Sequence, residues 1–195
     1  MHPYYGIYRH VRNAAWQCLC DFDVSAFPVD VRTIARSAGV RLLRDSIANL
    51  LQKDERGAVY FVDHSWVIVY DDSLPIANAR FTVAHELGHI FLGHDQIYLR
   101  YAQTRKPEKA LSEKQANQFA IRLLCPACVL SALDLHTAQE IADVCRVPLN
   151  VAEQRAKRMK TLYERQKFLT DPLEERVYRQ FEPYISNTLE EKRKL

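Results

Sequence analysis

The sequence predicts an α+β fold, in which a small sheet containing antiparallel strands packs on a central helix and a helical part follows at the C-terminus. Two runs rich in β-branched and aromatic residues, 59–62 and 66–70, are separated by three residues, which is typical of a hairpin. Apolar residues recur at helical spacing on both sides of this hairpin. Residues 137–168 have a helical pattern that is broken near Pro148. The hairpin between helical segments therefore indicates α+β.

The N-terminal part is expected to hold two helices and a strand before the hairpin. Apolar residues at helical spacing predict a first helix over residues 7–19. A second helix begins near Val31, and Gly39 stands where a helix-ending residue belongs. The segment VRLL, residues 40–43, is then predicted as a strand that joins the hairpin in the sheet.

A long helix is predicted after the sheet. Asp72 or Ser73 together with Pro75 forms a good helix start, and the helix should run over residues 76–92 until Gly93 ends it. The central motif of the chain lies in the middle of this helix.

The remaining segments alternate between a loop and further helices. Residues 101–112 are polar and contain a proline, so an exposed loop is expected there. A second long helix follows over residues 111–124, with Pro126 just beyond its end. We expect two domains, residues 1–135 and a helical C-terminal extension over residues 136–195.

Composition sets limits on where the chain acts. With 195 residues, 48% hydrophobic and 26% charged, it is long enough to bury a core. Its uncharged apolar runs are too short to span a bilayer, and the segment MHPYYGIYRHVRN lacks the apolar part of a signal peptide, so a cytoplasmic location is expected. Five cysteines then indicate reduced thiols, and a net charge of +3 does not by itself imply nucleic-acid binding.

The stretch FTVAHELGHIFLGHDQIYLR, residues 81–100, carries the chemistry. It contains His85, Glu86 and His89 in the order H-E-x-x-H. Residues four apart on a helix point the same way, so the two histidines can take two positions on one metal ion. Glu86, beside the first of them, can act as general base on the attacking water. Gly88, on the same side, is expected to leave room above the metal.

Spacing alone leaves the third metal ligand open. A catalytic zinc usually has three protein ligands and one open position. In the pattern H-E-x-x-H-x-x-G-x-x-H the ligand register falls on Asp95, but the turn glycine is displaced, and His94 is out of register by one residue. The other layout takes the ligand from the next helix, where Glu113 is favoured because Ala116 and Ala120 are small enough to let two helices approach closely. The plainer interpretation of Glu113 is a first-turn glutamate that favours the helix dipole.

Three further groups are candidates near the metal. Asn117, one turn after Glu113, is expected either to hydrogen-bond the metal ligands or simply to pack. A donor for the tetrahedral oxyanion is also needed, and His94, Tyr98 and Tyr101 are the candidates.

These residues match a known pattern. ARFTVAHELGHIFLGH followed by SEKQANQFAIRLLCP resembles the ImmA/IrrE-type metallopeptidases, whose pattern is R-F-T-x-A-H-E-x-G-H and then E-x-x-A-N-x-F-A-x-x-L-L-x-P. The resemblance covers residues 7–130 well, residues 137–160 loosely and the tail from Thr170 not at all. Cys125 departs from the pattern, since the family usually has methionine there.

The resemblance implies a zincin-like peptidase domain with one catalytic zinc ion. Carried over by position, it places the zinc on His85, His89 and Glu113, with Glu86 as the catalytic glutamate. It also implies a protein substrate, because such enzymes in phages and mobile elements typically cleave a helix-turn-helix repressor, whereas other members act in stress responses or toxin–antitoxin-like pairs.

Two features offer alternatives to this reading. Cys125 and Cys128, with Cys18 and Cys20, could hold a second, structural zinc, although reduced core cysteines are the simpler interpretation. Residues 137–167 resemble a helix-turn-helix with a basic second helix, which would make the chain a non-proteolytic regulatory protein that binds DNA or a partner. The plainer interpretation is a helical pair that closes the domain.

Overall fold

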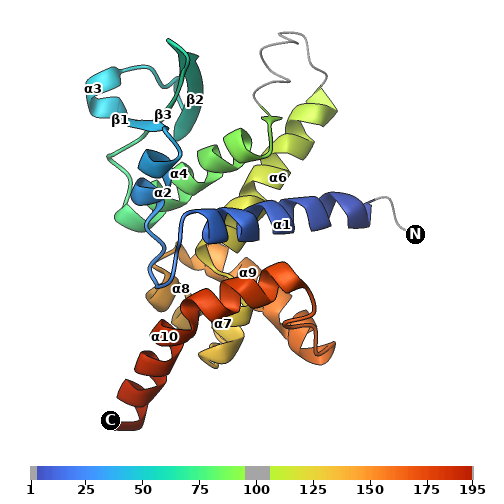
Figure 1. The fold of residues 1–195 in the computed structure, drawn as a ribbon. Coiled ribbons are helices and arrows are strands. Elements are labelled where there is room, and N and C mark those ends of the chain that lie inside the picture. Colours follow the sequence, from blue (N-terminus) through green and yellow to red (C-terminus); the bar gives the residue numbers. More distant parts are fainter. Residues whose placement is uncertain (1–3, 95–105, 195) are drawn as a thin grey trace. The chain divides into compact units, whose positions relative to one another are not determined.

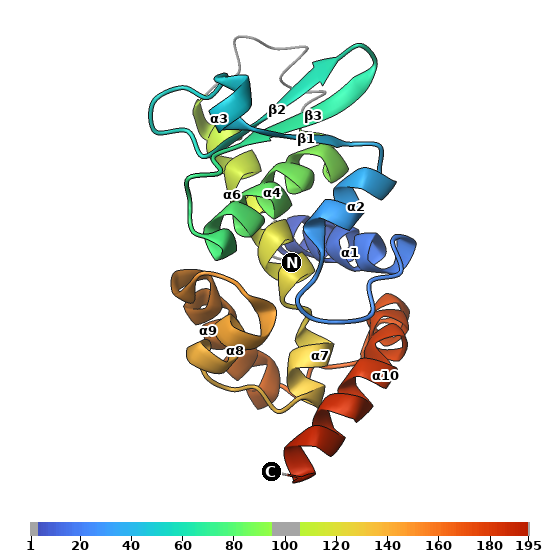
Figure 2. The same cartoon turned by 90° about the vertical axis from the view of Figure 1, so that its left-hand side faces the viewer.

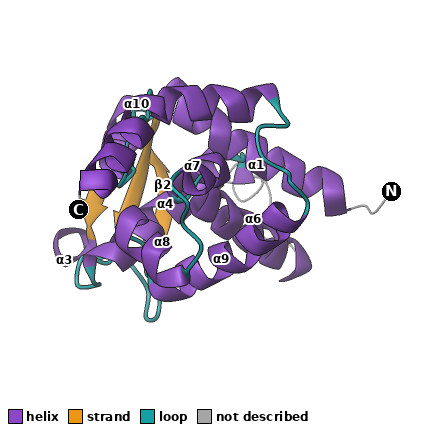
Figure 3. Cartoon of the chain, turned by 90° about the horizontal axis from the view of Figure 1, so that it is seen from below, coloured by secondary structure: helices purple, strands orange, loops and turns teal. Residues whose placement is uncertain are grey.

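The computed structural model describes residues 4–94 and 106–194 as an α+β chain in which helices predominate (Figures 1 and 3). This is the predicted fold class. The chain divides into two compact units: unit 1 comprises Met1–Ala14 and Val31–Ala120, and unit 2 comprises Ala15–Asp30 and Ile121–Leu195. The predicted division after residue 135 stays a prediction. Within the described ranges, no helix is both long and apolar enough to cross a membrane.

Unit 1 contains a three-stranded mixed sheet in the order β1-β3-β2. The strands are β1 (Arg41–Arg44), β2 (Gly57–Val62) and β3 (Ser65–Tyr70), and β3 runs parallel to β1 and antiparallel to β2. The hairpin is as predicted, but its turn is one residue shorter, because Ser65 already pairs with Val62. The two turn residues, both with positive φ, are Asp63 (φ 50°) and His64 (φ 60°).

Helix α4 (Ile76–Phe91) packs on β2 and β3, and α2 (Val31–Ser37) packs on α4 and β1 (Figure 2). Helix α4 begins at Ile76 after Pro75, as predicted, but neither Asp72 nor Ser73 caps it. Asp72 instead accepts hydrogen bonds from the backbone and hydroxyl of Ser46, in the turn of α3 (Asp45–Ala48) that the sequence did not predict. The helix ends as expected, with Gly93 at φ +70°.

Two longer helices contribute residues to both units. Helix α1 (Tyr4–Asp21) extends the predicted helix at both ends. Helix α6 (Lys106–Leu124) begins five residues earlier than expected, so the second half of the predicted loop is helical. The proline taken as a loop signal, Pro107, lies in the first turn of α6, where the missing N–H would have no helical partner in any case.

Unit 2 is helical, with α7 (Ala127–Ala132), α8 (Ala138–Cys145), α9 (Leu149–Glu164) and α10 (Pro172–Lys194). The predicted break near Pro148 is confirmed between α8 and α9, whereas α7 and α10 were not predicted. Helix α10 packs along α7 (Figure 1). The unit has its own core, whose largest fully buried side chains are Leu19, Leu123, Leu124, Leu130, Leu133, Ile141, Met159 and Phe181.

The start of α8 offers a test of local stability. Thr137 accepts a hydrogen bond from the Glu140 backbone at 3.2 Å, and the Glu140 carboxylate accepts from the Thr137 backbone at 2.8 Å, which forms a capping box. We expect Thr137→Ala to lower the free energy of unfolding by about 1 kcal/mol, measured by urea denaturation. Thr161→Ala, in the last turn of α9, is the control, and an equal loss in both variants would contradict the role of the cap.

Candidate metal centre

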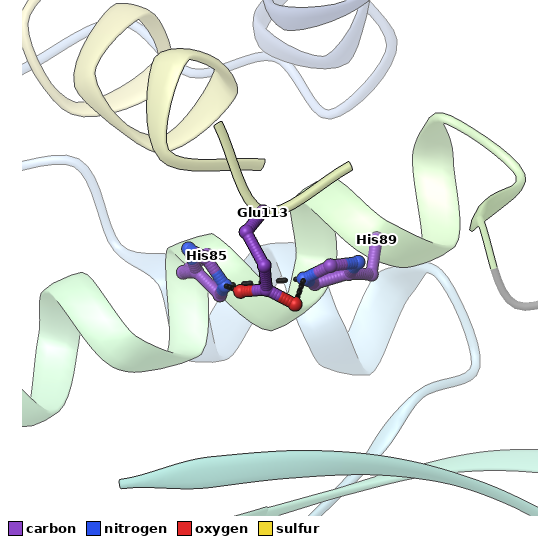
Figure 4. Close-up of side chains that lie close together, drawn as sticks. All are labelled: His85, His89 and Glu113. Atoms are coloured by element: carbon purple, nitrogen blue, oxygen red, sulfur yellow. Dashed lines mark hydrogen bonds and ion pairs between the residues drawn. The ribbon is translucent and has the colours of Figure 1, made fainter. Parts of the chain in front are cut away.

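Unit 1 brings together the three side chains that the sequence suggested as metal ligands. Helix α4 presents His85 and His89 on one side, one turn apart, and Glu113 of α6 faces them (Figure 4). The His85 Nε2 atom lies 3.1 Å from Nε2 of His89 and 3.2 Å from Glu113 Oε2, and the His89 Nε2 atom lies 3.6 Å from Glu113 Oε1. Among the described residues, this is the group of His, Cys, Asp or Glu side chains suited to hold a metal ion.

A glycine allows α6 to approach this closely. A β-carbon at Gly88 would lie 3.2 Å from both Cα and the backbone oxygen of Ala116, and 3.1 Å from Cδ1 of Phe119. The missing side chain of Gly88 therefore leaves room for α6, the helix that carries Glu113. The predicted role of Ala116 holds, since its backbone makes the close contact. Gly88 and Ala116 together set the distance from which Glu113 reaches the histidines.

The donor atoms fit a tetrahedral zinc ion. Bonds of about 2.0–2.1 Å to zinc place tetrahedral ligand atoms about 3.3 Å apart. The two Nε2 atoms lie 3.1 Å apart, and the Glu113 carboxylate approaches them with different oxygens, His85 with Oε2 at 3.2 Å and His89 with Oε1 at 3.6 Å. Two unprotonated Nε2 lone pairs facing each other at 3.1 Å would repel unless a cation or a proton lay between them. Two imidazoles and one carboxylate are also a donor set that zinc accepts in catalytic sites. The residues present therefore fit a zinc ion.

The charges around the cluster favour a cation. Burial alone would lower the pKa of His85, but the hydrogen bond to Glu113 and the charges of Glu86 and Glu113 outweigh it, so the pKa lies above its usual value. The hydrogen bond from His85, the largest cause, holds the pKa of the Glu113 carboxyl well below its usual range. Glu113 is therefore ionised at neutral pH, and a metal ion would compete with a proton for His85.

The second ring nitrogen, Nδ1, of both His85 and His89 also has a hydrogen-bonding neighbour. His85 Nδ1 lies 3.2 Å from Oδ1 of Asn117, so Asn117 makes the hydrogen bond that was one of its two predicted roles. His89 Nδ1 lies 3.2 Å from Nδ1 of His94, which is buried and whose Nε2 lies 3.0 Å from Oε1 of Gln115. Burial, followed by the proximity of His89, lowers the pKa of His94 to about 4. His94 is thus neutral at physiological pH.

Glu86 is buried, with 8% of its surface exposed, at the side of α4 that meets the sheet. A β-carbon at Gly57, the first residue of β2, would lie 2.9 Å from Oε1 of Glu86 and 2.6 Å from Cγ2 of Thr82. The absence of a side chain at Gly57 therefore leaves the space that the Glu86 carboxylate uses. No pattern in the sequence marks Gly57, since the contact depends on how β2 crosses α4.

Other predicted site residues stand apart from this cluster. Asp95, Tyr98 and Tyr101 lie outside the described residues, so their roles stay predictions. His94 contacts His89 at the nitrogen remote from Glu113, which does not fit the ligand role considered for it.

The cysteines fit the simpler of their two interpretations. All five are buried, and none of them forms a disulfide bond in the described part of the chain. Burial raises the pKa of Cys128 to about 12, so that thiol is protonated, whereas thiolate is the form that binds metals.

The helix-turn-helix-like segment consists of α8, a turn and α9. Arg146 occupies the turn position at which glycine is favoured and adopts a φ of +52°. Arg155, one of the basic residues of α9, is 4% exposed, and its Nε has no hydrogen-bond partner among the described residues. The basic surface of α9 is therefore smaller than its sequence suggests, with Lys157, Arg158 and Lys160 exposed.

A mixed sheet packed on an H-E-x-x-H helix, with a glutamate from a second helix facing both histidines, defines a metallopeptidase-like domain. The family model Peptidase_M78, described as the IrrE N-terminal-like domain, matches residues 35–157 of the 195 residues. The chain belongs to this family, as its resemblance to ImmA/IrrE-type proteins indicated.

A solved structure with a similar fold is that of a Mycobacterium tuberculosis transcriptional regulator. The two chains superpose with a TM-score of 0.55 at 15% identity, over 85% of this chain and 48% of the regulator. At this identity the likeness concerns the fold alone, and this chain spans about half the length of the regulator. The comparison with curated proteins gave no match.

Proposed function

We propose that this chain is a cytoplasmic zinc endopeptidase that cleaves a regulatory protein, most specifically a helix-turn-helix repressor of a phage or mobile element. The observation that carries the proposal is the cluster of His85, His89 and Glu113, whose candidate ligand atoms lie within 4.8 Å of one another, with the buried Glu86 next to the first ligand in the chain. Membership of a metallopeptidase family supports the reaction class. The repressor is proposed from the resemblance to ImmA/IrrE-type enzymes, and the free cysteines fit the cytoplasm.

The side chains divide the work of peptide hydrolysis. A bound zinc ion would supply Lewis-acid activation of water and of the scissile carbonyl. His85, His89 and Glu113 would hold the ion. Glu86 would take the proton of the attacking water and pass it to the leaving amine, since it follows the first ligand in the motif and its charge acts on His85. Burial of Glu86 and its contact with Gly57 limit the directions in which this carboxylate can point.

This division of roles predicts that Gly57→Ala impairs catalysis but not metal binding. The added methyl group would lie 2.9 Å from Oε1 of Glu86, so the carboxylate must move. We expect kcat to fall by about tenfold to 10²-fold, as for a misplacement of about 1 Å, with an unchanged dissociation constant for Zn²⁺. In the control Gly57→Ala/Thr82→Ser, the contact with the Thr82 methyl is removed, and kcat should stay low. Full activity of Gly57→Ala would contradict this placement of Glu86.

Mass spectrometry of a candidate substrate tests the proposed function. The substrate is the helix-turn-helix repressor encoded nearest this gene, incubated with the zinc-loaded chain and in parallel with its Glu86→Ala form. A single cut that only the unsubstituted chain makes is the expected result, and it also locates the scissile bond.

Two outcomes would count against the proposal. The same cut by the Glu86→Ala form would show that a contaminating protease is responsible. No cut in the repressor or in unfolded casein, combined with salt-dependent retention of the chain on DNA, would instead favour the non-proteolytic alternative.

A further inference from the structure

His94 is a buried histidine outside the group of candidate metal ligands, yet it contacts one of them. It lies three residues after the end of α4, and 5% of its surface is exposed. Its Nδ1 is 3.2 Å from Nδ1 of His89, and its Nε2 is 3.0 Å from Oε1 of Gln115. Both ring nitrogens of His94 are thus engaged, one with a ligand of α4 and one with α6.

The hydrogen positions in the series His89, His94 and Gln115 follow from the amide oxygen of Gln115. The amide oxygen of Gln115 can only accept, so a neutral His94 carries its proton on Nε2 and leaves Nδ1 as an acceptor. His89 must then donate from its own Nδ1, which leaves Nε2 of His89 unprotonated. This Nε2 is the atom that faces His85 Nε2 at 3.1 Å and Glu113 at 3.6 Å.

We propose that His94, anchored by Gln115, is a positioning residue that fixes His89 in the tautomer and ring orientation needed to bind a metal ion through Nε2. This inference rests on the proposed zinc site. Gln115 and Glu113 lie two residues apart on α6, so the same helix turn supplies one metal ligand and holds the orientation of another. Asn117 performs the corresponding role for His85 directly, without an intervening histidine.

Zinc affinity of the purified chain, measured by competition with a chromophoric chelator, tests the proposal. His94→Phe keeps a ring in the buried space but cannot accept the His89 proton, and we expect the dissociation constant for Zn²⁺ to rise about 10–100-fold. His94→Asn places an amide oxygen near the original Nδ1 position and should restore most of the affinity. His10→Phe, at an exposed position of α1, is the control and should bind as the unsubstituted chain does.

The tautomer gives a second, spectroscopic readout on the metal-free protein. In ¹⁵N spectra of the histidine rings, His89 should be protonated on Nδ1 in the unsubstituted chain, and on Nε2 to a substantial degree in His94→Phe. Gln115→Leu leaves His94 in place without its anchor and should weaken zinc binding in the same direction. This variant keeps the test decisive if His94→Phe does not fold.

Several results would overturn the inference. Unchanged zinc affinity in His94→Phe and Gln115→Leu would show that His89 needs no such support. Equal losses in His94→Phe and His94→Asn would show that packing, rather than the hydrogen bond, is responsible. If the unsubstituted chain binds no zinc, the metal centre and this inference fail together. If all variants bind zinc as the unsubstituted chain does, only the inference fails.

Discussion

The Glu86→Gln form of this protein is expected to bind zinc as tightly as the unsubstituted chain and to hydrolyse peptide bonds about 10²–10⁴ times more slowly. Glutamine keeps the size of the side chain and removes the carboxylate that accepts a proton. Because Glu86 is buried, an amide at this position is held in the same space and cannot be replaced by a freely moving water molecule. The lost rate therefore measures proton transfer.

The measurement compares kcat on a fluorogenic peptide, after the scissile sequence is known, with zinc affinity from chelator competition. Glu140→Gln is not a suitable control, because Glu140 takes part in the capping box of α8. Glu153→Gln, at an exposed position of α9, is the control. Activity of Glu86→Gln within a few-fold of the unsubstituted chain would rule out Glu86 as the proton acceptor.

The candidate site could largely be predicted because its geometry is local. Helical periodicity alone places His85 and His89 on one side of α4, whatever surrounds the helix. The choice of Glu113 needed a second helix, and the small residue Ala116 indicated that such a helix could approach closely. The sequence could not indicate that Ala116 would pack against Gly88. A glycine within a helix carries no pattern that shows which helix it will contact.

The hydrogen bonds that orient the metal ligands were harder to predict from the sequence. His94 was considered as a ligand or an oxyanion donor, since a histidine near the motif suggests contact with the metal. Its actual neighbours, His89 and Gln115, depend on how the chain turns after Gly93 and on the rotation of α6 about its axis. Neither quantity follows from spacing along the chain.

Parts of the fold were missed for identifiable physical reasons. Pro183 lies inside α10, although proline usually argues against a helix interior, and Pro107 lies in the first turn of α6, where proline is tolerated. The C-terminal helix α10 is rich in charged residues, which conceal the helical spacing of its few apolar ones. Three of them, Val177, Phe181 and Ile185, recur every four residues and are buried. Their spacing was therefore a usable helical signal within the tail.

Replacement of Glu113 has the largest expected effect on metal binding and settles the third ligand. Its carboxylate is the negatively charged member of the cluster and lies within 3.6 Å of both Nε2 atoms. Glu113→Ala leaves two neutral imidazoles, and we expect zinc affinity to fall by more than the roughly 10–100-fold lost with an orienting partner. Without the hydrogen bond and charge of Glu113, the pKa of His85 should also fall, because both raise it in the unsubstituted chain.

Two further variants separate charge from geometry. Glu113→Gln retains an oxygen donor but loses the negative charge, so its zinc affinity should lie between those of Glu113→Ala and the unsubstituted chain. Glu153→Ala, at an exposed position of α9, should bind zinc normally. Unchanged zinc affinity in Glu113→Ala, together with a loss in Asp95→Ala, would transfer the third ligand to the residues after α4. The helix pairing set by Gly88 and Ala116 would then serve stability alone, since it would no longer position a ligand.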